Sequence, residues 1–173
     1  MTADTLAADI ASILDRDLRT LRREIEAYPD EGQLWQELPG QPNTAGTLAL
    51  HLAGNLQHYI GARWGGTGYV RDRAAEFARR GVSRAALIGD IEAARSAVAL
   101  ALSRVSAGEL AQDYPEEIGG TRVRTGEYLV HLCTHMAYHL GQVDAHRRAV
   151  TGNREGVGAM RPTELGSAQP VAR

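Results

Sequence analysis

Apolar residues recur at intervals of three and four positions in four separate stretches of the chain, residues 4–27, 43–66, 83–108 and 125–153. Charged and small residues lie between them, so each stretch has one apolar and one polar face when it is helical. The first stretch shows this most clearly, with Leu6, Ile10, Ile13, Leu14, Leu18, Leu21 and Ile25 as its apolar positions. The pattern predicts four amphipathic helices of about 20 residues each and contains no strand-like alternation.

Capping residues and glycines mark the ends of these predicted helices. Asn43 or Thr44 is suited to cap the second helix and Ser83 the third, because their side chains accept hydrogen bonds from free backbone N–H groups. The ends of the second, third and fourth helices are predicted at Gly65, near Gly108 and at Gly152.

Two long connections separate the helices. Residues 28–42 are rich in proline and glycine and contain one large apolar side chain, Trp35, which predicts an ordered loop. Residues 65–81 are charged and interrupted by glycines, so we expect either a crossover or a lid, with one short turn at 74–77. A crossover allows the second and third helices to run parallel, whereas a simple up-down bundle does not need it.

The composition is that of an ordinary globular chain with one core, since 43% of the 173 residues are hydrophobic and 23% are charged. We therefore predict an all-α domain over residues 1–153. Its predicted architecture is a four-helix bundle with a crossover connection between the second and third helices. Residues 154–173 contain few apolar positions and are expected to form a loosely ordered tail.

Charge and residue usage exclude several classes of function. The net charge is -2, without the positive excess of proteins that bind a phosphate backbone, so we expect no nucleic-acid partner. All 19 basic residues are arginine, and without lysine neither Schiff-base chemistry nor a P-loop is available. The single cysteine, Cys133, excludes an intramolecular disulfide. A signal peptide and a long apolar run are both missing, so we expect a cytoplasmic protein without a membrane partner.

The six histidines lie in only two of the predicted helices. The second helix carries His51 and His58, and the fourth carries His131, His135, His139 and His146. At about 100° per residue, the four histidines of the fourth helix fall within an arc of roughly 80°. Buried imidazoles without partners are costly, and a metal ion would satisfy several of them at once.

The spacing of these histidines points to a particular ligand set. His135 and His139 are one helical turn apart and can chelate one ion, and His51 on the facing helix is the favoured third ligand. Three neutral imidazoles suit Zn, Ni, Cu or Fe(II) and leave a position open for water or substrate. The zinc-protease pattern HExxH is absent, because Met136 follows His135. Cys133 is predicted to point away from the histidines and to be a core residue.

Four further side chains are expected beside the ligands. Asn55 and Gln142 are one turn from His51 and His139 and can orient a ligand imidazole or bound water. His58 and His131 are candidates for the same supporting role. If either of these two were instead a fourth ligand, the closed site would favour metal storage or structure over catalysis. Haem held by two histidines is a weaker alternative, because two histidines one turn apart favour chelation of one ion.

Two segments of this sequence resemble the DinB/YfiT-like superfamily, LHLAGNL at 50–56 and HMAYHLGQV at 135–143. The resemblance runs from Ile10 to Val150 and includes the stretches 71–73 and 76–77. It implies a bundle with a crossover, often a homodimer, with a divalent metal held by His51, His135 and His139. Zn or Ni is the implied metal, with Fe or Mn as alternatives.

The resemblance also implies a type of activity. Characterised relatives include bacillithiol S-transferases and mycothiol-dependent maleylpyruvate isomerase, so a low-molecular-weight thiol and a small-molecule substrate are expected. Arg63, Arg71 and Arg73 are candidate contributors to a thiol pocket by their charge. The resulting hypothesis is a metal-dependent thiol S-transferase, isomerase or hydrolase, and the alternative is a non-catalytic metal-binding or stress-response bundle protein.

Overall fold

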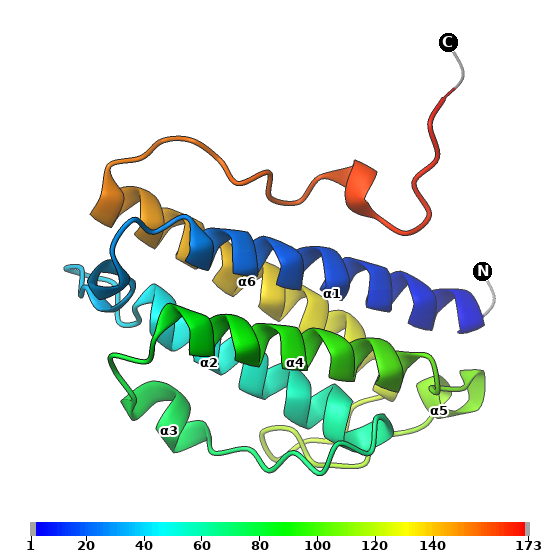
Figure 1. Ribbon diagram of the computed structural model, residues 1–173. Coiled ribbons are helices and arrows are strands. Elements are labelled where there is room, and N and C mark those ends of the chain that lie inside the picture. Colours follow the sequence, from blue (N-terminus) through cyan, green and yellow to red (C-terminus); the bar gives the residue numbers. More distant parts are fainter. Residues whose placement is uncertain (1–2, 172–173) are drawn as a thin grey trace.

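The computed structural model describes residues 3–171 and shows a helical bundle (Figure 1). Its four long helices are α1 (Ala3–Glu26), α2 (Ala45–Leu56), α4 (Arg84–Leu102) and α6 (Thr125–Thr151). Within residues 3–171 there is no strand, and pairing outside the helices is limited to isolated bridges in the loops. The all-α prediction is confirmed.

The connection after α2 is a crossover. Figure 1 shows α2 and α4 running in one direction and α1 and α6 in the opposite direction. The chain from Gly65 to Ser83 therefore returns along the length of the bundle, and it includes the short helix α3 (Arg73–Ala78) near the turn predicted at 74–77. This arrangement confirms the predicted crossover, and it places α3 against α2.

The predicted helix starts are confirmed by their caps. The Thr44 hydroxyl accepts a hydrogen bond from the Thr47 N–H at 3.3 Å, and the Ser83 hydroxyl accepts one from the Ala86 N–H at 3.3 Å. Gly152 ends α6 in the left-handed conformation, with φ 69°, which glycine adopts without steric cost. In the loop before α2, residues Glu31–Trp35 form a 3-10 helix, and the Trp35 indole N–H donates to the Val82 carbonyl at 3.2 Å.

One predicted boundary and the geometry of one helical segment differ from the structure. The third long helix was expected to reach Gly108 but ends at Leu102, and Ser106 starts a separate helix, α5 (Ala107–Ala111). Ser106 and Glu109 form a capping box, which favours a new helix start over continuation of α4. Helix α2 continues as a π-helical turn, η2 (Gln57–Ala62), which the 3.6-residue pattern did not predict.

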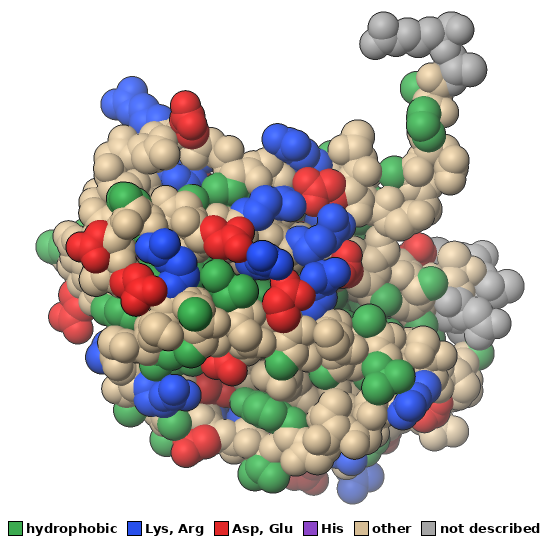
Figure 2. Space-filling view, in the orientation of Figure 1, with side chains coloured by type: hydrophobic (Ala, Val, Ile, Leu, Met, Phe, Trp, Pro, Cys, Tyr) green, Lys and Arg blue, Asp and Glu red, His purple; other side chains and the backbone are tan. Residues whose placement is uncertain are grey.

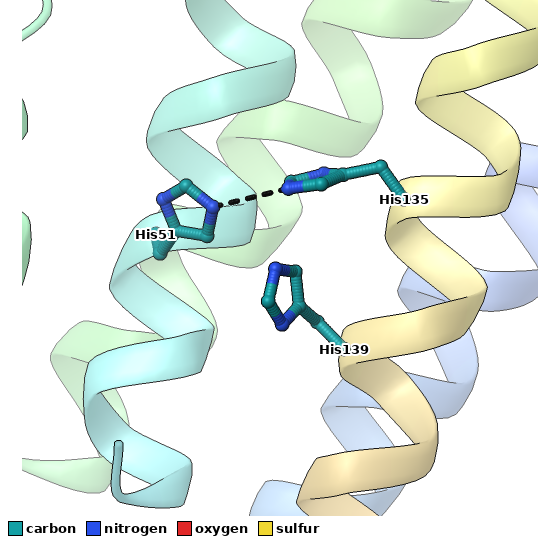
Figure 3. Close-up of side chains that lie close together, drawn as sticks. All are labelled: His51, His135 and His139. Carbon is teal, nitrogen blue, oxygen red and sulfur yellow. Dashed lines mark hydrogen bonds between the residues drawn. The ribbon is translucent and has the colours of Figure 1, made fainter. Parts of the chain in front are cut away.

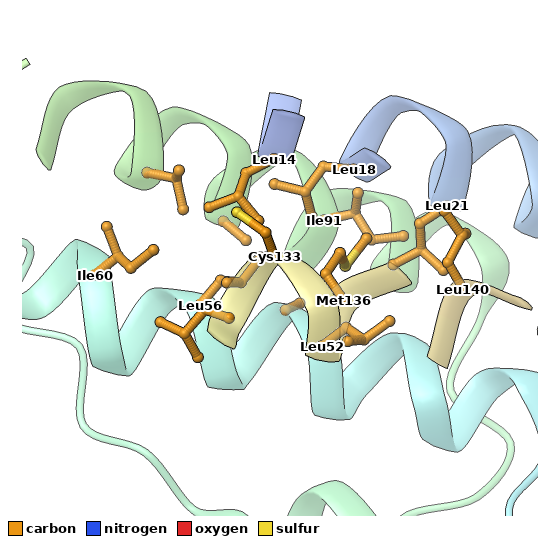
Figure 4. Close-up of a cluster of buried hydrophobic side chains, with 14 of the residues drawn as sticks. Leu14, Leu18, Leu21, Leu52, Leu56, Ile60, Ile91, Cys133, Met136 and Leu140 are labelled. Carbon is orange, nitrogen blue, oxygen red and sulfur yellow. The ribbon is translucent and has the colours of Figure 1, made fainter. Parts of the chain in front are cut away.

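The core lies where all four long helices meet (Figure 4). It is filled mainly by leucine and isoleucine side chains, including Leu14, Leu18, Leu21, Leu52, Leu56, Ile60, Ile91 and Leu140. Each such side chain contributes about 1.5–3 kcal/mol when fully buried. Cys133 and Met136 pack in the same cluster, on the side of α6 that faces the core.

The outer face formed by α1 and α4 is covered by charged side chains of both signs (Figure 2). Ion pairs across these helices include Arg22 with Glu92 at 3.2 Å and Arg95 with Asp15 at 2.7 Å.

The chain after α6 runs back along α1, where the Gly166 N–H donates to the Ser12 hydroxyl at 2.6 Å. The single-domain boundary and the loose ordering of 154–173 stay predictions. In the described part of the chain, no helix combines the length and apolar character needed to span a membrane.

Candidate metal centre

Three histidines from two helices meet between α2 and α6 (Figure 3). His51 projects from α2, and His135 and His139 project from successive turns of α6. The Nε2 atoms of His51 and His135 are 3.3 Å apart, and the potential ligand atoms of all three residues lie within 4.8 Å of one another. Among the described residues this is the one cluster of three or more candidate metal ligands. The structure thus brings together the three side chains that the sequence pattern selected.

His51 is held by a buried carboxylate from the crossover segment. Its Nδ1 lies 3.0 Å from Oε2 of Glu76, and Arg71 donates to both carboxylate oxygens of Glu76 at 2.7 and 2.8 Å. Burial alone would raise the pKa of the Glu76 carboxyl, but its hydrogen bonds to Arg71 and His51 lower it below the usual range. An ionised carboxylate accepts hydrogen bonds, so His51 carries its proton on Nδ1 and directs the Nε2 lone pair toward the cluster.

Gly54 allows this carboxylate to approach α2. A Cβ atom at position 54 would overlap Oε1 of Glu76 and would lie 3.1 Å from the Tyr69 hydroxyl. A glycine in a helix interior costs about 0.5–1 kcal/mol relative to alanine. The close approach of α3 to α2 accounts for its presence here.

On α6, Gln142 contacts Nδ1 of His139, as Glu76 contacts Nδ1 of His51. The Nδ1 atom of His139 lies 2.6 Å from Oε1 of Gln142, one turn further along the helix. An amide oxygen accepts a hydrogen bond, so His139 also carries its proton on Nδ1 and leaves Nε2 free. Burial lowers the pKa of His139, although the bond to Gln142 opposes that effect.

His135 is the least supported of the three rings. Its Nδ1 is buried without a hydrogen-bond partner among the described residues. Burial, together with the neighbouring His139 and His51, lowers the pKa of His135 to about 4, so its imidazole is neutral at pH 7. The site therefore offers three imidazoles, and His51 and His139 direct a lone pair inward. This donor set fits a divalent ion of the Zn or Ni type.

The three histidines form part of the wall of a cleft with a volume of about 390 Å³, within the usual size range of small-molecule sites. Tyr59, Phe77 and Tyr128 supply aromatic surface. Asn55 lines the cleft but makes no hydrogen bond to His51. His131 is exposed at the edge of the cleft and stacks on Tyr128, with the ring centroids 5.8 Å apart.

The other predicted candidates lie elsewhere. His58 is paired with Glu116 at 3.2 Å, and Arg63 contacts the same carboxylate, so neither lines the cleft. The α-helical geometry gives way to a π-helical turn at Gln57, so regular helical spacing from His51 no longer applies at His58. Arg71 and Arg73 do line the cleft. Cys133 is buried in the core, as predicted, and burial raises the pKa of its thiol to about 12.

Sequence reasoning missed the role of Glu76. It lies 25 positions from His51 in a charged connection, so no helical spacing relates the two residues. The available signal was Arg71 and Glu76, five positions apart in the charged crossover and followed by Phe77. Only the packing of α3 on α2 shows that this carboxylate contacts a histidine of the cluster.

Comparison with known proteins identifies the family. Searches of curated proteins and of solved structures return no match. The family model described as mycothiol-S-transferase matches residues 9–152, a range that includes all four long helices except the first residues of α1, and all three clustered histidines. This match agrees with the DinB/YfiT-like resemblance of the two histidine segments. The chain belongs to the mycothiol S-transferase family.

Proposed function

We propose that the protein is a metal-dependent S-transferase that joins the sulfur of a low-molecular-weight thiol, mycothiol, to an electrophilic small molecule. The observation that carries this proposal is the convergence of three imidazoles in the wall of a cleft of small-molecule size. In the reaction the thiol loses its proton and a C–S bond forms. The electrophile then either releases a leaving group with its electron pair or takes up a proton.

The residues of the site have distinct roles in this proposal. His51, His135 and His139 would hold the ion, and Glu76 and Gln142 keep the Nδ1 protons of His51 and His139 turned away from it. When bound there, a divalent ion would lower the pKa of a thiol that binds it and so supply the thiolate, which is the nucleophile. Tyr59, Phe77 and Tyr128 supply apolar surface against which the reacting molecules can pack.

Several finer features belong to the same proposal. Zn or Ni is the favoured ion because three imidazoles suit either metal, with Fe or Mn as alternatives. Neither His58 nor His131 belongs to the cluster, which supports an open coordination position and therefore catalysis. We further propose a cytoplasmic homodimer, and a mass measurement in solution that returned a monomer would contradict the second part.

The decisive experiment measures metal content and thiol transfer on the same preparations. The parent protein, His135→Ala, His51→Ala and the control His58→Ala are purified without added metal and analysed for bound elements. Each is then assayed for conjugation of mycothiol to a bromobimane, with cysteine as a comparison thiol. We expect about one ion per chain in the parent and the control, with loss of both metal and transfer in the other two variants.

The outcomes separate the candidate functions. Metal binding without transfer of any thiol would favour the alternative of a non-catalytic metal-binding or stress-response protein. If metal persisted in both His135→Ala and His51→Ala, the three histidines would not be the ligands and the proposal would be wrong. Isomerase and hydrolase activities can be tested on the same metal-loaded protein.

A further inference from the structure

The solvent-exposed side of α6 carries apolar and small side chains but no charge. From Tyr128 to Val143 the helix contains no aspartate, glutamate, arginine or lysine. Two large side chains on this side, Val130 and Tyr138, are 45% and 66% exposed. The exposed positions recur every three or four residues and form a strip along the helix, which we call the α6 face: Val130, Thr134, Tyr138, Gly141 and Ala145.

The outward sides of α1 and α4 differ from the α6 face, because charged side chains of both signs cover them (Figure 2). Single exposed apolar residues are ordinary on protein surfaces, whereas a continuous uncharged strip marks a surface that binds another molecule. At 1.5 Å per residue the α6 face extends for about 22 Å. All five of its residues are exposed in the described chain, so its length and shape suit a second helix.

The charges at the two ends of the α6 face identify that helix. Glu127 precedes the face and its side chain is 67% exposed, and Arg148 follows the face with 37% of its side chain exposed. When two copies of α6 pack antiparallel, Glu127 of each copy is opposite Arg148 of the other. A parallel pair would instead place like charges together at both ends. Complementary charges fix orientation and partner, so the face is complementary to a second copy of itself with the direction reversed.

The sizes of the side chains agree with this register. When Glu127 is opposite Arg148, each larger side chain of the face is opposite a smaller one: Val130 opposite Ala145, Thr134 opposite Gly141, and Tyr138 opposite Ala137. A Cβ atom at position 141 would meet no atom of the described chain within 4 Å, so the space above Gly141 is open to a side chain of the second copy. The same pairs recur on both sides of a twofold axis between positions 137 and 138, as a symmetric dimer requires.

From these observations we infer that the α6 face binds a second copy of this chain through antiparallel packing of the two α6 helices. The inference rests on the proposed homodimer and assigns its interface. It also places the interface beside the candidate metal centre, because the ring of Tyr138 lies 5.1 Å from that of His139. Each copy would therefore contact its partner next to its own three-histidine cluster.

Sedimentation of two matched arginine variants tests the interface. The parent is expected to sediment with twice the chain mass of 18.7 kDa. Thr134→Arg places two positive charges at the centre of the contact, so it should sediment as a monomer at concentrations where the parent is a dimer. Ala93→Arg adds the same charge to an exposed position of α4 and should remain a dimer. The helical circular dichroism and the metal content of both variants should equal those of the parent.

Cysteine variants test the direction of packing without a bulky substitution. The only native cysteine, Cys133, is buried and should not react. In the antiparallel register, position 138 lies beside its own counterpart, whereas position 130 lies about 22 Å along the axis from its counterpart. When diamide oxidises the thiols, Tyr138→Cys should therefore form a disulfide-linked dimer and Val130→Cys should remain a single chain on a non-reducing gel.

The outcomes separate the interface from the homodimer itself. If Thr134→Arg remained a dimer, or if Ala93→Arg alone dissociated, the copies would meet at another face and the inference would be wrong, although the homodimer would stand. If Val130→Cys crosslinked as readily as Tyr138→Cys, the antiparallel register would be wrong. A parent that sedimented as a monomer at every concentration would contradict both the homodimer and its interface, and would leave the proposed S-transferase reaction untouched.

Discussion

His135 and His146 lie on the same helix, about three turns apart, and the sequence places both in one histidine stripe. Their surroundings differ. His146 is 1% exposed, and both of its ring nitrogens are paired, Nδ1 with the Tyr28 hydroxyl and Nε2 with the Gln36 carbonyl, each at 2.8 Å. His135 is half-buried beside a cleft, and its Nδ1 has no partner in the described chain. One ring is fully satisfied by the protein, and the other is not.

This difference separates a structural histidine from a candidate ligand. Around His146, the neighbouring Arg147 is buried against Glu24 and also donates to Asp144 at 2.9 Å, so this end of α6 is a network of protein groups. Around His135, the nearest polar atoms are other imidazoles with free lone pairs. We therefore expect substitutions at the end of α6 that packs against Glu24 to affect stability. Substitutions at the three-histidine cluster are expected to affect metal binding.

The largest effect is expected from Arg147→Met. This substitution leaves the Glu24 carboxylate, which is 0% exposed, without its cation and should lower the free energy of unfolding by about 3–5 kcal/mol. Urea unfolding of the metal-free protein measures the loss, and metal content should be unchanged. In the double variant with Glu24→Gln most of the loss should be recovered, because no buried charge is left unpaired. An Arg147→Met protein that lost its metal would contradict the separation of the two regions.

The next effect compares the two histidines directly. His146→Leu leaves the buried Tyr28 hydroxyl without a partner, at a cost of about 1–3 kcal/mol, removes the hydrogen bond to the Gln36 carbonyl, and should keep the metal. His135→Leu removes an unpaired buried nitrogen, so the metal-free protein should be equally or more stable while metal binding is lost. Thermal unfolding and elemental analysis of both variants test this. If metal-free His135→Leu lost more stability than metal-free His146→Leu, the proposed difference between the two histidines would be wrong.

Much of the fold could be predicted because the apolar periodicity is local. Thr44, Ser83 and Gly152 cap their helices through interactions within a few residues, so sequence spacing was sufficient to place them. The end of α4 was placed too late because Val105 continues the apolar pattern, although Ser106 caps the next helix. The π-helical turn at Gln57 has no periodic signature at all.

The cluster was predictable to a similar extent, and for a similar reason. His135 and His139 are related by one helical turn, and His51 is one of only two histidines on the facing helix. The partners of His146 and His51 were not predictable, because Tyr28, Gln36 and Glu76 reach them from distant parts of the chain. Their contacts depend on how the loops and α3 pack against the long helices.

A smaller effect is expected at the carboxylate that orients His51. Glu76→Gln keeps the size of the side chain but removes its charge, and it should weaken metal affinity by about 10–100-fold, as is usual for hydrogen-bond partners of ligand histidines. Gly54→Ala should have a similar effect, because the new methyl group displaces Glu76. Competition with a chromophoric chelator measures both affinities. The matched control is Gly89→Ala, since a Cβ at that position on α4 meets no other atom.

If metal affinity were unchanged in Glu76→Gln, the carboxylate would not orient His51. Ion pairing with Arg71 would then be its whole role. That result would leave the three-histidine cluster in place but would remove Glu76 from the residues that support it.

The smallest expected effect is on how the free energy of unfolding depends on pH. Once metal is present, this dependence should remain at His146 and not at the three-histidine cluster. Burial lowers the pKa of His146 below the value of about 6.5 that it has in the unfolded chain. Below that pH the unfolded state binds a proton that the folded state does not, so the stability contributed by neutral His146 is lost as the pH falls. Below pH 6.5, the free energy of unfolding of the parent should therefore rise with pH more steeply than that of His146→Leu. The contributions of other titrating groups, including Glu24, are the same in both proteins and cancel when the two curves are subtracted. Bound metal should not remove the difference between the curves, because His146 lies outside the cluster.

Parallel curves for the two proteins would show that burial does not hold His146 neutral. The contrast with His135 would then rest on hydrogen bonding alone.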